Sequence, residues 1–102
     1  MFRLQFHYQV RLGEFRQFYD LFEQLDKVVI KKGLHRSTLW GGTVGNLNNA
    51  VTFTEYETIS DFWNDLNAFQ ADSDCMNLRS QMGRHVEGIP RSELWESAVQ
   101  IA

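Results

Sequence analysis

A chain of 102 residues is long enough for one domain, and its 43% hydrophobic content can form a core. A net charge of −3 without a basic run disfavours binding to nucleic acid or to an anionic membrane. The single cysteine, Cys75, excludes an intramolecular disulfide, and no apolar run approaches the roughly 20 residues of a membrane span.

The first part of the chain predicts a strand, a helix and a second strand. Residues Phe2 to Leu12 alternate apolar and polar side chains, which is typical of a strand with one apolar face. From Glu14 to Lys32 apolar side chains recur every three or four positions, which predicts an amphipathic helix. Gly33 is the expected C-terminal cap of this helix, and a shorter strand is expected from His35 to Trp40.

The second part predicts two further strands and a helix in two parts. A loop rich in glycine and asparagine leads into a strand with β-branched and aromatic residues. Thr58 or Ser60 can cap the next helix, and the Asp-Ser-Asp sequence at 72–74 can interrupt it and cap a continuation. The expected ranges are Gly41–Asn49 for the loop, Ala50–Glu57 for the third strand, Thr58–Met82 for the interrupted helix, Gly83–Pro90 for a second loop and Arg91–Val99 for the last strand.

The order β-α-β-β-α-β predicts a ferredoxin-like α+β fold. Two right-handed crossovers place both helices on one face of a four-stranded antiparallel sheet, with the first and third strands at its centre. Phe53 is expected on the face that the helices cover. The face of the sheet without helices is expected to be polar but mostly uncharged. Two copies are therefore expected to pair through it into a dimeric α-β barrel, although a monomer with a solvated sheet stays possible. The side chains assigned to this open face are Gln5, His7, Gln9, Thr52 and Thr54.

The least generic part of the chain is a turn and the strand behind it. Gly45-Asn46-Leu47-Asn48 is followed by Val51-Thr52-Phe53-Thr54-Glu55-Tyr56. This stretch resembles the NIPSNAP family of dimeric α-β barrels, whose pattern is roughly G-P-L-N and then V-H-x-W-x-Y. Tyr8 and Gly13 also stand where the family's first strand has its Tyr and Gly. The resemblance implies a single dimeric α-β barrel domain over residues 1–102.

The polar residues of the family pattern are not kept. The family's Pro is Asn46 here, its strand His is Thr52, and its Trp is Thr54. The Arg that often follows the strand falls at Phe62, and the first-strand Arg falls at Phe6. The resemblance therefore implies the scaffold and not the same site chemistry.

Aromatic residues are abundant and can line an apolar pocket between helices and sheet. The resemblance extends to cofactor-free quinol monooxygenases and haem-degrading oxygenases, which are similar in fold and bind flat aromatic substrates there. Of the three residues that the haem-degrading members use, only the Trp has a counterpart here, near Trp63. An aromatic stripe at helical spacing is also typical of an ordinary core. The candidate pocket residues are Tyr8, Trp40, Thr52, Thr54, Tyr56 and Trp63.

Titratable residues offer one weak catalytic candidate, His7, whose unperturbed pKa near 6.5 suits acid–base work. A hydrogen-bonded histidine at the dimer interface is the alternative interpretation. His7, His35 and His85 lack the spacing of a metal site, and no phosphate loop or dinucleotide motif occurs. No cofactor and no metal are expected. Cys75, near a helix start, is interpreted as a structural thiol.

Two functions remain. The first is a homodimer that binds a small apolar or aromatic molecule, with neither nucleic acid nor membrane as a partner. The alternative is a cofactor-independent monooxygenase or isomerase of the antibiotic-biosynthesis-monooxygenase type. A cavity of about 300 Å³ or more with a titratable group opening into it would favour the enzyme. Because the N-terminus lacks the apolar core of a signal peptide, a cytoplasmic location is expected.

Overall fold

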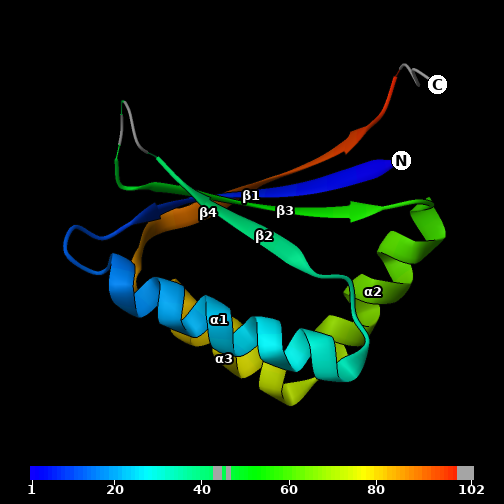
Figure 1. The fold of residues 1–102 in the computed structure, drawn as a ribbon, viewed down its shortest axis with the longest axis horizontal. Helices are drawn as coiled ribbons and strands as arrows, with labels where there is room; N and C mark the ends of the chain where they lie inside the picture. Colours follow the sequence, from blue (N-terminus) through cyan, green and yellow to red (C-terminus); the bar gives the residue numbers. More distant parts are fainter. Residues whose placement is uncertain (43–44, 46, 99–102) are drawn as a thin grey trace.

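One four-stranded antiparallel sheet carries the helices on one of its faces (Figure 1). The computed structural model describes residues 1–42, 45 and 47–98. The strand order is β2-β3-β1-β4, so the first and third strands are central, and the ferredoxin-like order is confirmed. The elements are β1 (Phe2–Val10), α1 (Phe15–Lys32), β2 (Ser37–Gly41), β3 (Asn49–Tyr56), α2 (Ile59–Ala71), α3 (Ser73–Gly83) and β4 (Val86–Glu96).

The pairing of β1 with β3 corrects the facing predicted for the third strand. Leu4 lies opposite Thr54 and Phe6 opposite Thr52, and directly opposed residues of an antiparallel pair share a face. Thr52 and Thr54 are each only 6% exposed, so they lie beneath the helices and not on the open face. Phe53 consequently lies on the open face, where it was not expected. Alternation shows which residues share a face, but only the register shows which face is covered.

The last strand begins earlier than the sequence pattern predicts. β4 starts at Val86, and residues 83–90 were expected to form a loop. Its pairing with β1 shifts between His7 and Gln9, where Gly88 adopts a φ of 68°. An edge strand with a bulge can contain a glycine and a proline, which lacks a backbone N–H. Gly88 and Pro90 are typical loop residues, so the sequence pattern did not indicate a strand here. Val99, the predicted end, lies outside the described residues.

The helix ends confirm the predicted caps. Gly33 adopts a φ of 71°, and its N–H and that of Leu34 reach the carbonyls of Ile30 and Val29. The Thr58 hydroxyl accepts a hydrogen bond from the backbone N–H of Asp61 at the start of α2. A second cap, from Asp72, separates α2 from α3 as the Asp-Ser-Asp sequence predicts.

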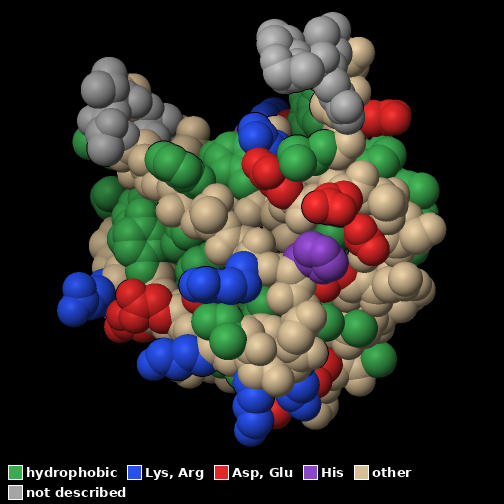
Figure 2. All heavy atoms as spheres, turned by 45° about the vertical axis from the view of Figure 1, so that its right-hand side comes forward, with side chains coloured by type: hydrophobic (Ala, Val, Ile, Leu, Met, Phe, Trp, Pro, Cys, Tyr) green, Lys and Arg blue, Asp and Glu red, His purple; other side chains and the backbone are tan. Residues whose placement is uncertain are grey.

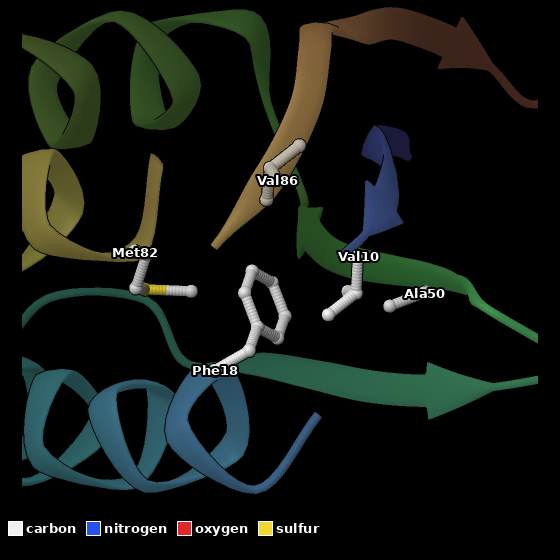
Figure 3. Close-up of a cluster of buried hydrophobic side chains, with 5 residues drawn as sticks. All are labelled: Val10, Phe18, Ala50, Met82 and Val86. Atoms are coloured by element: carbon white, nitrogen blue, oxygen red, sulfur yellow. The ribbon is translucent and has the colours of Figure 1, made fainter. Parts of the chain in front are cut away.

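The core closes one end of the space between sheet and helices. Phe18 of α1 is fully buried and lies at the centre of the cluster in Figure 3. Val10 and Ala50 meet it from the two central strands, and Met82 and Val86 from α3 and β4. This cluster ties the start of α1 to the end of α3, so that the remaining helical layer is held over the sheet.

Asp72 also joins α1 to α3. Its Oδ2 lies 2.9 Å from Lys32 Nζ, and its Oδ1 accepts a 3.0 Å hydrogen bond from the Cys75 backbone N–H. The hydrogen bond from Lys32 and that backbone N–H lower the pKa of Asp72 from 3.8 to about 2. Because its folded-state pKa is depressed, the carboxylate stabilises the fold above pH 3.8, and that contribution is lost as the pH falls to about 2.

Replacing Asp72 with Asn should therefore reduce the pH dependence of stability at acid pH. We expect the variant to have a lower free energy of unfolding than the parent at pH 6. Its free energy of unfolding should also fall less than that of the parent between pH 4 and pH 2. Urea denaturation at each pH measures both effects. Glu57→Gln, which removes an exposed carboxylate that does not act on Lys32 or Asp72, is the control and should keep the parent slope. A parent-like slope in Asp72→Asn would contradict the assignment.

Candidate functional site

A cavity of about 500 Å³ lies between the covered face of the sheet and the helices. Along β1, Val10 belongs to the core, whereas Tyr8, Phe6 and Leu4 line the cavity. Its volume falls within the roughly 300–1,000 Å³ that is usual for ligand sites. Most of the apolar lining comes from β1 and from all three helices. It includes Phe22, Leu25 and Val29 of α1, Leu66 and Phe69 of α2, and Met76 and Met82 of α3.

One wall of the cavity carries a hydrogen-bonded network around Asp65 of α2. The Tyr56 hydroxyl donates to Oδ2 of Asp65 over 3.1 Å. The backbone N–H of His35 donates to Oδ1 over 2.8 Å, and His35 Nδ1 lies 3.1 Å from the same oxygen. The Asp65 side chain is 9% exposed and that of His35 is 42% exposed, so the network runs from the interior towards solvent.

The network continues along the sheet through hydroxyl groups. Burial and the Asp65 carboxylate raise the pKa of Tyr56 above its ordinary value, so this phenol stays protonated at neutral pH. Its oxygen also has a hydrogen bond with Thr54, whose Oγ1 lies 2.5 Å from Oγ of Ser37. These groups can hold a polar atom of a ligand or transfer a proton across the wall.

Asp65 was not among the predicted site residues, although its position on α2 indicates a buried charge. Asp65 stands three residues after Phe62 and four before Phe69, on the apolar side of the helix. A charged residue on such a stripe needs a partner inside the fold. His35 and Tyr56 supply it, but they come from two other parts of the chain and no local pattern joins them.

Further polar side chains line the cavity outside the network around Asp65. Burial raises the pKa of the Tyr8 hydroxyl, while a hydrogen bond with Thr52 and the charge of Arg79 act in the opposite direction. Arg79 of α3 lines the cavity, with its Cζ 5.7 Å from the ring centroid of Phe6. Asp26 also lines the cavity and is held by Arg36 through contacts of 3.1 and 2.8 Å.

Four of the six candidate pocket residues line this cavity: Tyr8, Thr52, Thr54 and Tyr56. The other two, Trp40 and Trp63, are 61% and 54% exposed and lie outside the lining, which corrects their placement. Trp40 pairs with Val51 and therefore faces the open side, and Phe62 occupies the inward position beside Trp63. That the four lining residues bind a ligand stays a prediction.

His7, the weak catalytic candidate, lies on the open face and not in the cavity. Its Nε2 lies 3.0 Å from Oε1 of Glu93, within ion-pair range but without hydrogen-bond geometry. Burial raises the pKa of the Cys75 thiol to about 11, which disfavours a reactive thiolate. Within residues 1–42, 45 and 47–98, no three His, Cys, Asp or Glu side chains cluster as metal ligands. No helix in that part of the chain is long and apolar enough to cross a membrane.

No protein-family model matches the sequence, and no curated protein is significantly similar to it. Solved structures do match. An uncharacterised NIPSNAP domain protein from Burkholderia xenovorans has a TM-score of 0.81 at 17% identity, over 100% of this chain and 99% of that one. A NIPSNAP family protein from Agrobacterium tumefaciens has a TM-score of 0.75 at 11% identity, over 95% and 85%. An antibiotic biosynthesis monooxygenase has a TM-score of 0.77 at 11% identity, over 97% and 100%.

These similarities define the class of fold. The chain has the ferredoxin-like α+β fold that NIPSNAP domain proteins and antibiotic biosynthesis monooxygenases share, along nearly its whole length. The resemblance inferred from the turn and strand at residues 45–56 is thereby confirmed at the level of structure. At such low identity it is a likeness of fold, and the activity of those proteins is not carried over.

Proposed function

We propose that the protein is a NIPSNAP-like homodimer that binds a small apolar or aromatic molecule in the cavity beneath its helices. The observation that carries this proposal is the cavity itself, which is about 500 Å³ in volume and lined mainly by apolar side chains. A few convergent polar groups, from Asp65 to Ser37 on one wall, are the usual means by which such a site orients its ligand.

The open face of the sheet supports the proposed homodimer. Trp40 and Trp95 are 61% and 54% exposed, and both pair with residues of that face. Phe53 lies between them, 6.4 Å from the Trp40 ring and 5.3 Å from the Arg3 guanidinium. Figure 2 views the molecule from the side and shows hydrophobic side chains at the surface in the upper half, where the sheet lies. A second copy would cover these rings, because patches of this kind mark interaction sites.

The dimer predicts a mass in solution of twice the 12.0 kDa of one chain. Light scattering after size exclusion at micromolar concentration measures it directly. Phe53→Glu, which puts a charge at the centre of the open face, should shift the mass to that of one chain. Glu23→Phe, on the exposed side of α1, is the control and should leave the dimer intact. A monomeric parent would contradict the proposal.

Ligand binding is tested by filling the cavity. N-phenyl-1-naphthylamine, a neutral aromatic fluorophore, should bind the parent with an increase in emission. Leu66→Trp adds volume to the cavity wall and should weaken that binding at least about tenfold, because the probe loses its space. Ala68→Trp, at an exposed position of the same helix, should bind as the parent does. Equal binding by both variants would show that the cavity is not the site.

The alternative is a cofactor-independent monooxygenase or isomerase, and one observation favours it. Asp65 and His35 form a pair on the cavity wall, and such a pair can accept a proton from an acidic hydroxyl of a substrate. In oxidation of a quinol, one atom of O₂ would enter the ring and the other would leave as water, with the substrate supplying the electrons. The titratable group that favours an enzyme is thus His35 and not His7.

The alternative predicts oxygen uptake with 1,4-dihydroxynaphthalene and no added metal or cofactor, above the rate without protein. Asp65→Asn keeps the size of the side chain but weakens the proton acceptor. It should lower the protein-dependent rate of oxygen uptake at least about a hundredfold. Asp61→Asn, on the same helix but outside the cavity, should keep it. If the parent protein does not increase oxygen uptake, the enzyme alternative is wrong. The proposal that the cavity binds a ligand is not affected by that result.

A further inference from the structure

Among the described residues that line the cavity, Arg79 is the charged residue without a hydrogen-bond or ion-pair partner. The carboxylate of Asp26 is paired with Arg36, and that of Asp65 is held by Tyr56 and His35. Within the described part of the chain, no side chain forms a hydrogen bond or an ion pair with Arg79. Of the charged groups in the described lining, both carboxylates therefore have hydrogen-bond partners, and the guanidinium of Arg79 has none.

Arg79 is an exposed residue of α3 that also lines the cavity, so its cation meets both the cavity and solvent. Its guanidinium lies over the ring of Phe6, and its charge reaches the phenol of Tyr8, which is also a lining residue. Contact with an aromatic ring orients a guanidinium without using its five N–H donors. Those donors stay available to a molecule in the cavity.

The balance of charges decides which kind of ligand fits. Arg79 is exposed, so its guanidinium is hydrated, and a neutral apolar molecule in the cavity offers it no hydrogen bond in place of that water. A carboxylate would replace that water with charge-assisted hydrogen bonds, for which the planar guanidinium is well suited. Because burial keeps the Tyr8 hydroxyl protonated, it can donate a further hydrogen bond to the same anion.

We propose that the ligand of this cavity is an organic monoanion, an aromatic or apolar body with one carboxylate that binds Arg79 beside Tyr8. This rests on the proposed binding function and narrows its ligand class. The apolar body would lie against Phe6, which Arg79 contacts, and against Phe22 and Leu25, which line the same cavity. The network around Asp65 stays available to another polar group of the ligand.

Two fluorescent probes with the same ring frame test the proposal. 8-Anilinonaphthalene-1-sulfonate carries an anionic group that N-phenyl-1-naphthylamine lacks. The parent should bind the sulfonate more tightly than the neutral probe. Arg79→Gln should weaken sulfonate binding about tenfold, the effect of losing one charge-assisted hydrogen bond, and change neutral-probe binding by less than about twofold. Arg79→Lys keeps the positive charge and should retain most of the preference for the sulfonate probe over the neutral probe.

The matched control is Arg84→Gln, which removes the same charge from α3's C-terminal end, outside the cavity lining. It should bind both probes as the parent does. Circular dichroism and thermal unfolding check that each variant keeps its fold.

The outcomes separate this proposal from the one on which it rests. Equal weakening of both probes in Arg79→Gln would mean that Arg79 only packs on Phe6, and would overturn the anion subsite alone. Unchanged sulfonate binding in Arg79→Gln, or equal weakening in Arg84→Gln, would also overturn it. Probe binding that is absent from the parent, or that survives Leu66→Trp, would overturn the cavity as a ligand site and the subsite with it.

Discussion

The antiparallel register between β1 and β3 is the constraint on which the rest of the structure depends. It sets Leu4 against Thr54 and Phe6 against Thr52, so that one face of the central pair combines apolar side chains with hydroxyl groups. The helices cover that face, and Phe53 is left on the other. A shift of one residue would exchange the two faces of β3 and bury Val51, Phe53 and Glu55 instead.

Buried hydroxyl groups on the covered face explain why the space above them is a cavity and not a continuation of the core. Tyr56 and Thr54 satisfy their polar atoms with Asp65 and Ser37, and apolar side chains cannot replace those partners without leaving hydroxyls unpaired. The core cluster around Phe18 closes the other end and holds α1 over the sheet. The polar network and the closed core together define the volume that a ligand can occupy.

Much of the fold follows from local patterns. The stripe on α1, the caps at Gly33, Thr58 and Asp72, and the order of elements each depend on residues close in sequence, and each is found as predicted. The predicted start of β4 was wrong because Gly88 and Pro90 are typical loop residues. An edge strand can contain both of them at a bulge. The placement of Trp40 in a pocket was also wrong, because its face follows from pairing with Val51.

The candidate site was predictable only in part. Its four strand residues could be selected as polar and aromatic groups on regular strands. Their partners Asp65, His35, Ser37 and Arg79 come from other parts of the chain. The sequence by itself determined which segments are strands and helices and which side chains share a face, since these depend on periods of about two and 3.6 residues. Only the tertiary structure decided which face is covered, which charges are paired and where the cavity lies, because these depend on contacts between residues far apart in the chain.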